Sequence, residues 1–257
     1  MGKRLVFGDD GSDHADLAWR WIAAHSWPGW SVDVISALPP DGGTTTAPPP
    51  RVPPAEGFAD SVAPQVVEGD PRVALLKASR DADLLVVGPR GRGLLKAMHL
   101  GSTSEWLIQA PPVPLVIARS DRPTARVVVA ADGSVHSHAA AAAVAALPWS
   151  EQLEVLVVTV GDQREGTAIA DAAANLVRES VASVHTRVLH PDSLPVFVRA
   201  RDVLLDVIAE WGADLVALGS QGVTSWQSVA EAGVLRAGST ASGVAAHSPC
   251  SVLIARG

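Results

Sequence analysis

The sequence predicts an α/β protein built as two tandem domains, each a doubly wound, five-stranded parallel sheet with helices on both faces. Three observations lead to this fold class. The chain of 257 residues exceeds the usual size of one compact domain. Its two halves repeat the same segments in the same order. Within each half, short apolar runs alternate with helix-like stretches, as in successive βαβ units.

The internal repeat defines the two domains. The run from Arg4 to Ser12 matches the run from Arg126 to Ser134 at an offset of 122 residues. Segments 83–88 and 214–219 match at an offset of 131, and segments 101–103 and 114–119 match 238–240 and 251–256 at 137. The second copy has therefore gained nine residues in its middle and six near its end. We place the first domain at 1–121 and the second at 125–257, on either side of a short polar segment that contains a proline.

Each copy contains five strand-like runs. In the first copy they lie at 4–9, 31–37, 62–67, 84–88 and 114–118, and in the second at 126–131, 153–160, 185–189, 214–218 and 251–255. We expect the strands of the first copy to be apolar on both faces, because helices cover both sides of such a sheet.

The helices expected between these strands differ in the two copies. In the second copy one helix is expected from His136 through an alanine-rich stretch to Leu147, and another over 167–184. The matching place in the first copy holds the prolines of residues 39–54, which exclude a regular helix. We expect a loop there, and the first domain loses all or most of its second helix.

Composition narrows the classes of function. Apolar residues make up 47% of the chain, but no run is long enough to span a membrane. The N-terminus turns acidic before a signal-peptide apolar region can form, so we expect a cytoplasmic protein. A net charge of −7 argues against a role in coating nucleic acid. The single cysteine, Cys250, excludes an internal disulfide and, beside an apolar run, predicts a buried structural thiol.

A glycine-rich loop follows the fourth strand of the first copy. It reads Gly88-Pro89-Arg90-Gly91, then nine residues, then Gly101-Ser102. In an open α/β sheet, ligands bind beyond the carboxyl ends of the strands, where the loops after strands one and four meet. Glycines let a phosphate approach backbone N–H groups, and a helix opened by Gly101-Ser102 points its free N–H groups at an anion. Ser102 would donate to phosphate, and Arg90, Arg92 and Lys96 would supply positive charge.

This loop spacing resembles the nucleotide-binding loop of the ATP-binding branch of the universal stress protein family. The strand-one signature Asp10-Gly11-Ser12, the helix entry Glu68-Gly69-Asp70-Pro71 and the approach Pro112-Val113-Pro114 resemble the same family. The likeness covers nearly the whole chain twice, as in the tandem two-domain type. It implies a Rossmann-like fold of the adenine nucleotide alpha hydrolase-like kind and an adenine nucleotide, ATP with or without magnesium, as ligand.

The resemblance also implies positions for the ligand. Asp10 would lie at the adenine or its neighbouring ribose, and the backbone of Ala37 would approach the base. The expected nucleotide-binding residues are Asp10, Ala37, Gly88, Arg90, Gly91, Arg92, Gly101, Ser102 and Thr103. No catalytic and no metal-ligating residue is assigned. The family likeness further implies that the two domains pack through their fifth strands as an intramolecular pseudo-dimer, and a homodimer stays open.

Other nucleotide and catalytic motifs do not fit. Leu94-Leu95 stands where a Walker loop needs Lys and Ser or Thr, and no G-x-G-x-x-G or G-x-S-x-G is found at a suitable place. We therefore expect an ATP-binding regulatory or stress-response protein without dedicated catalytic machinery. Two alternatives stay open. One is a nucleotide hydrolase or transferase in which Asp10 or Asp9 holds magnesium, and the other is a nucleotide-free scaffold whose glycines are only structural.

The second copy departs from the binding pattern. Fifteen residues separate Gly222 from Gly238, and this interval brings Glu231 while Arg236 is its only basic residue. We expect one nucleotide per chain, bound in residues 1–121. His136 and His138 are expected to be surface residues and not metal ligands. The tryptophans are expected mostly in the core or at the domain interface: Trp19, Trp21, Trp27, Trp30, Trp106, Trp149, Trp211 and Trp226.

Overall fold

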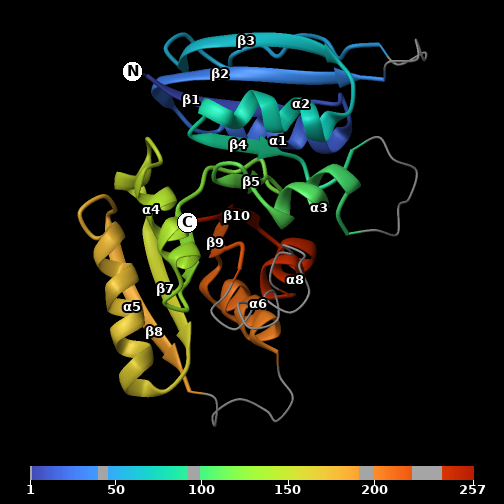
Figure 1. Cartoon of the computed structure of the whole chain (residues 1–257). Coiled ribbons are helices and arrows are strands. Elements are labelled where there is room, and N and C mark those ends of the chain that lie inside the picture. Colours follow the sequence, from blue (N-terminus) through green and yellow to red (C-terminus); the bar gives the residue numbers. More distant parts are fainter. Residues whose placement is uncertain (1, 40–45, 92–98, 191–198, 222–238) are drawn as a thin grey trace. The chain divides into compact units, whose positions relative to one another are not determined.

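Two compact α/β units make up the chain in the computed structural model (Figure 1). The structure describes residues 2–39, 46–91, 99–190, 199–221 and 239–257. The first unit comprises Met1–Leu107 with Pro112–Pro123, and the second comprises Ile108–Pro111 with Thr124–Gly257.

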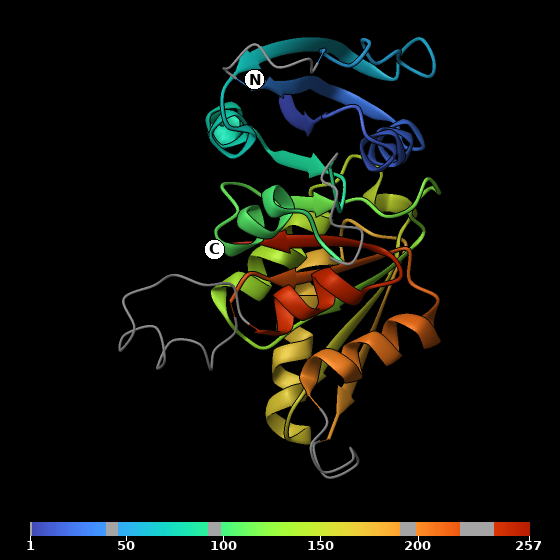
Figure 2. The same ribbon diagram turned by 90° about the vertical axis from the view of Figure 1, so that its right-hand side faces the viewer.

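The first unit contains a parallel sheet in the order β3-β2-β1-β4-β5. Its strands are β1 (Lys3–Gly8), β2 (Trp27–Leu38), β3 (Ala59–Glu68), β4 (Leu84–Val87) and β5 (Leu115–Ile117). Its helices are α1 (Asp13–Ala23), α2 (Pro71–Ala78) and most of α3 (Ser102–Gln109), with a 3₁₀ turn η1 (Ser79–Asp81). Figure 2 shows α1 and α2 on opposite sides of this sheet. The order reverses between β1 and β4, which is where ligands bind in doubly wound sheets.

The second unit repeats this topology, with its strands in the order β10-β9-β6-β7-β8. They are β6 (Arg126–Ala130), β7 (Glu154–Val160), β8 (Ser183–Leu189), β9 (Leu215–Gly219) and β10 (Ser251–Ala255). Its helices are α4 (Val135–Ala145), α5 (Gln163–Val177), α6 (Ala200–Trp211) and α8 (Ser239–His247), with a 3₁₀ turn η2 (Ser150–Gln152). Figure 1 shows α4 and α5 on one face of the sheet and α6 and α8 on the other. The predicted fold class and all ten predicted strands are confirmed.

The strand-one signature builds the same turn in both units. Ser12 caps α1, its hydroxyl accepting a hydrogen bond from Ala15 N at 3.2 Å, and Ser134 caps α4 in the same way with Ser137 N at 3.1 Å. Both serines have extended backbone and lie where an N-cap satisfies a free helical N–H group. The repeat therefore preserves a local structure that turns the chain from a buried central strand into its first helix.

Two expectations about the elements need correction. The expectation of strands apolar on both faces fails for β3, which is the edge strand and is mostly exposed, so its polar residues face solvent. The helix predicted over 167–184 is α5, which begins and ends earlier. Asp162 caps it by accepting from Arg164 N and Glu165 N, and the chain has already entered β8 at Ser183.

The proline-rich segment of the first unit replaces a helix, as predicted. Its described residues 46–58, which we call the strap, contain no helix and lead directly into β3. Phe58, at the end of the strap, is buried, and its ring centroid lies 6.2 Å from that of Trp19 on α1. The strap is thus anchored at one end by the aromatic core that α1 contributes.

The remaining core expectations are mostly confirmed. Cys250 is buried, as are the tryptophans Trp19, Trp21, Trp27, Trp30 and Trp149. Trp106 is an exception because it is 40% exposed, and Trp226 lies outside the described residues. The prediction of a surface His136 is wrong. This side chain is buried at the start of α4, and its Nδ1 accepts a hydrogen bond from Gly257 N at 3.0 Å.

Candidate functional site

A cavity of about 350 Å³ opens at the carboxyl ends of β1 and β4 in the first unit. Eight of the nine residues predicted to bind nucleotide line it: Asp10, Ala37, Gly88, Arg90, Gly91, Gly101, Ser102 and Thr103. The ninth, Arg92, lies outside the described residues, as does Lys96. The structure therefore brings together, at the point where the strand order reverses, side chains that are up to 93 positions apart in sequence.

The lining of the cavity is partly apolar and partly polar. Ala15, Ile35, Leu75, Val87 and Leu100 supply aliphatic surface, and the glycine loop and the start of α3 supply backbone and hydroxyl groups. Small-molecule sites commonly combine an apolar lining with a few directed polar groups. This lining suits a small ligand that has both an apolar part and a polar or anionic part.

The described ends of the glycine loop are held together by hydrogen bonds. Gly101 N donates to Pro89 O at 2.8 Å, and the buried Ser104 hydroxyl donates to Gly88 O at 2.8 Å. Glu105 N donates to Gly101 O at 2.8 Å, which begins the hydrogen bonding of α3. Ser102, Thr103 and Ser104, in the first turn of α3, line the cavity, and the N-terminus of a helix generally favours an anion.

Gly88 and Gly91 are glycines for different physical reasons. A Cβ at Gly88 would lie 2.6 Å from the carbonyl oxygen of His14, so the end of β4 packs directly on the backbone of α1. Gly219 repeats this contact in the second unit, where a Cβ would lie 2.8 Å from the backbone of His136. Close packing against α1 is therefore enough to explain why position 88 is a glycine. A Cβ at Gly91 would instead overlap Oδ2 of Asp10, a side chain that lines the cavity.

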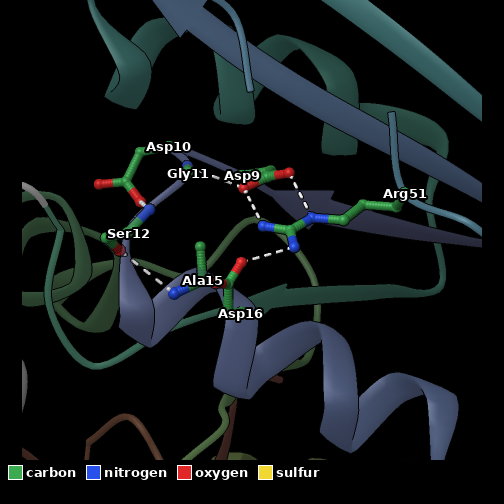
Figure 3. Close-up of polar contacts among 7 residues, drawn as sticks. All are labelled: Asp9, Asp10, Gly11, Ser12, Ala15, Asp16 and Arg51. Carbon is green, nitrogen blue, oxygen red and sulfur yellow. Dashed lines mark hydrogen bonds and ion pairs between the residues drawn. The ribbon is translucent and has the colours of Figure 1, made fainter. Parts of the chain in front are cut away.

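Asp10 and Asp9 are adjacent but have separate environments (Figure 3). Oδ1 of Asp10 accepts a hydrogen bond from Ser12 N at 3.1 Å, and Figure 3 shows its carboxylate turned away from Arg51. The Asp9 side chain is 1% exposed, and its two oxygens accept from Nε and Nη2 of Arg51, both at 2.7 Å. Arg51 therefore engages both oxygens of Asp9, whereas the carboxylate of Asp10 lies apart from Arg51 and also lines the cavity.

Arg51 completes a cluster that the sequence analysis did not identify. Its Nη1 donates to Oδ1 of Asp16 on α1 at 2.6 Å, so one guanidinium joins two carboxylates. Burial opposes the charge on Arg51, but the hydrogen bonds and charges of Asp9 and Asp16 outweigh it and raise its pKa. Comparison of the two copies in the sequence could have pointed to this cluster. The equivalents of Asp9 and Asp16 are Ala131 and His138, so both acids are peculiar to the copy with the strap.

A second cavity of about 490 Å³ adjoins the first and shares with it Asp9, Asp10, Ala37 and Pro71. Pro48 of the strap and Asp70, the N-cap of α2, also line it. The strap therefore contributes a wall next to the candidate site.

The ionisation of His14 on α1 responds to burial and to the charged residues around it. The pKa of His14 on α1 is lowered first by burial and then by the positive charges of Arg90 and Arg119, while Asp13 and Asp10 oppose this shift.

The second unit keeps part of this arrangement. Oδ1 of Asp132 accepts from Ser134 N at 3.0 Å, as Asp10 does from Ser12. The position of Arg90 is taken by Gln221, which is buried and neutral. The long interval with Glu231 and Arg236 lies outside the described residues. Among the described residues, no cluster of three or more His, Cys, Asp or Glu side chains suits a metal ion, and none of their helices is long and apolar enough to cross a membrane.

Comparison with known proteins identifies the family to which the chain belongs. A family model of universal stress proteins matches residues 54–119 and 123–256. A universal stress protein of Mycobacterium tuberculosis strain H37Rv is 40% identical over 63 residues, which span 24% of this chain and 20% of that protein.

Two solved structures share the fold over nearly the whole chain. A universal stress protein from Archaeoglobus fulgidus DSM 4304 has a TM-score of 0.70 at 18% identity and covers 98% of both chains. A functionally unknown protein from Pseudomonas aeruginosa PAO1 has a TM-score of 0.58 at 12% identity, covering 99% of this chain and 92% of that one. Since the family model matches well over half of the residues, the chain belongs to the universal stress protein family.

Proposed function

We propose that the first unit binds ATP as a regulatory ligand in a cytoplasmic stress response, without a dedicated catalytic step. The observation that carries the proposal is the convergence of eight predicted residues on one cavity at the reversal of the strand order. These residues come from the ends of two strands, the glycine loop and the start of α3, and packing alone does not require that combination.

In this proposal the ligand uses both the apolar and the polar lining of the cavity. The phosphates would lie at the first turn of α3, where Ser102 and Thr103 and the free N–H groups meet the charge of Arg90. The adenine would lie toward Ala37 and the aliphatic residues beside it, and the carboxylate of Asp10 would accept from a ribose hydroxyl or the base.

Two other functions differ from this one in their requirements. A magnesium-dependent hydrolase needs a metal ligand and a base. Asp9 is bonded to Arg51, which leaves Asp10 as the acid that magnesium bound to phosphate could contact. Hydrolysis of nucleotide at ordinary enzyme rates, dependent on a divalent metal, would favour the hydrolase over our proposal. A nucleotide-free scaffold predicts that neither retained nor added nucleotide binds, so mass spectrometry of the supernatant of the heat-denatured protein separates it from our proposal.

Calorimetric titration of ATP into the whole chain tests the site directly. Asp10→Ala should weaken binding by about tenfold, the scale of one hydrogen bond to a charged group. Asp132→Ala is the matched control. It removes the equivalent hydrogen bond, from Ser134 N, in the second unit and should leave the affinity for ATP unchanged. Ser102→Ala should weaken binding by about 1–2 kcal/mol. Equal affinity in wild type and Asp10→Ala would refute the assignment of the site.

A further inference from the structure

The strap and the cluster of Arg51, Asp9 and Asp16 occur together. In the second unit α5 occupies the place of the strap, and Ala131 and His138 occupy the places of the two acids. Loss of the helix thus coincides in this chain with three charged residues that join the replacement segment to the end of β1 and to α1.

The cluster is built so that it holds its geometry. The guanidinium makes two parallel hydrogen bonds to a carboxylate that is 1% exposed, and the Arg51 side chain is itself only 12% exposed. Such a fork fixes orientation as well as distance. Separation of the pair would leave the Asp9 charge buried without a partner, which is strongly unfavourable. The guanidinium also lies 5.9 Å from the centroid of the Phe7 ring on β1.

The cluster continues into the candidate nucleotide site. The oxygen of Asp9 that accepts from Nη2 of Arg51 also accepts from Gly11 N at 2.9 Å, so the arginine braces the loop that follows β1 (Figure 3). Asp10, the next residue in that loop, lies against Gly91 of the glycine loop. A chain of direct contacts therefore runs from the strap through Asp9 to the cavity, and Pro48 of the strap lines the adjoining cavity.

We infer that Arg51 is a positioning residue of the nucleotide site and couples the strap to the ligand. With Arg51 in place, the loop after β1 presents Asp10 to the cavity. Nucleotide bound against Asp10 in turn holds the Asp9–Arg51 pair and the strap. This inference rests on the proposed function, because it names the element that supports the proposed ligand. Coupling between two sites is reciprocal, so the factor by which the strap strengthens binding equals the factor by which nucleotide orders the strap.

The test measures both directions of this coupling in the whole chain. Arg51→Met removes the fork and keeps an aliphatic side chain of similar length. Val52→Cys introduces a thiol on the strap at a side chain that is 75% exposed, for a fluorophore whose anisotropy reports the motion of the strap. The native Cys250 is buried, so unmodified protein serves as the labelling control. Affinity for ATP is measured by calorimetry in parallel.

Arg4→Met is the matched control for a simple loss of stability. Arg4 lies at the opposite end of β1, and its Nε pairs with Asp33 at 3.3 Å, with both side chains partly buried. We expect Arg51→Met to weaken ATP binding about tenfold, within the usual range of coupling between sites. It should also lower the anisotropy of the label and abolish the rise that ATP produces. Arg4→Met should change none of these. Arg51→Lys, which can restore one of the two bonds to Asp9, should recover part of the affinity.

The outcomes separate the inference from the proposed function. If the wild type does not bind ATP or another adenine nucleotide, the proposed function fails, and the inference with it. If the wild type binds ATP and Arg51→Met binds it equally well, only the inference fails. The inference also fails if Arg4→Met and Arg51→Met lower the affinity by the same factor. Asp16→Asn supplies a milder variant should Arg51→Met not fold, because Asp16 is 45% exposed and its change should weaken binding in the same direction.

Discussion

The carboxylate of Asp10 lies directly against Gly91, at a place where any side chain on Gly91 would overlap its Oδ2 atom. This contact joins the loop after β1 to the loop after β4, the two loops that meet at the candidate site. The position of Gly91 in the loop after β4 thus determines where the carboxylate of Asp10 can lie.

Gly91→Ala is therefore expected to displace Asp10 and to weaken ATP binding about tenfold, with little loss of thermal stability because the end of a side chain can move aside. Calorimetry of a double-mutant cycle checks the mechanism. In an Asp10→Ala background the added Gly91→Ala change should have no further effect. A full additional loss in that background would show that Gly91 contacts the ligand directly.

The packing of β4 on α1 makes a different prediction for Gly88. A Cβ there would meet the backbone of His14, which cannot move like a flexible side chain, and Gly219 meets His136 in the same way. Gly88→Ala and Gly219→Ala should each destabilise their own unit by about 1–3 kcal/mol, as over-packed positions do. Scanning calorimetry follows the two units separately. Gly161→Ala, where a Cβ meets nothing within 4 Å, should leave both transitions in place.

The buried His136 predicts a pH dependence of stability. Burial and then the charge of Arg256 lower its pKa below the ordinary value of 6.5, although Asp132 partly opposes the shift. The folded protein therefore binds this proton less readily than the unfolded chain. The resulting stabilisation is complete above pH 6.5 and is lost as the pH falls toward the folded-state pKa.

Denaturant unfolding between pH 7.5 and 5 measures this loss, whose slope is at most about 1.4 kcal/mol per pH unit for one proton. His136→Asn keeps an acceptor for Gly257 N but removes the titration, so its stability should fall less steeply with pH. His185→Asn, which makes the same replacement at an exposed histidine of β8, controls for the substitution itself. An unchanged slope in His136→Asn would contradict the assignment.

The edges of the two sheets predict how the units associate. In each unit the fifth strand, β5 or β10, ends its own sheet and carries a run of aliphatic residues. Unpaired apolar edges are a liability that pairing removes. We expect the two units to pack through these strands as an intramolecular pseudo-dimer. Small-angle scattering should then give a radius of gyration of about 18 Å for a compact monomer of this length. A larger, two-lobed particle would contradict the pairing, and the scattering mass would reveal a homodimer.

The fold and the residues that line the cavity could be predicted from the sequence better than the contacts among them. The repeat identified the strands, and the glycine spacing together with the family resemblance named eight residues that line one cavity, because both kinds of signal depend on positions along the chain. The Arg51 cluster was missed because it joins residues 35 and 42 positions apart through a segment without periodicity. The burial of His136 was missed because helix periodicity does not show that Gly257, 121 positions later, contacts it.

The two units are expected to differ in nucleotide binding, with one ATP per chain bound in residues 1–121. Both units build the turn of Asp10 or Asp132, but Arg90 of the first is matched by the buried, neutral Gln221 in the second. The second loop also has 15 − 9 = 6 more residues and includes the acidic Glu231, which would repel a triphosphate by about 1 kcal/mol at partly exposed distances.

Calorimetric titration should therefore saturate near one equivalent of ATP per chain. The measured stoichiometry, and not the affinity, decides whether the second unit binds. Asp10→Ala should weaken this binding, whereas Asp132→Ala should leave both stoichiometry and affinity as in the wild type. Arg90→Gln places in the first unit the residue that the second already has, and it should weaken binding there by about 1.5–3 kcal/mol, the scale of a charge-assisted hydrogen bond. Two equivalents of similar affinity would show that neither the longer loop nor the missing arginine prevents binding. A crystal structure with ATP against Gly238 and Ser239 would show the same.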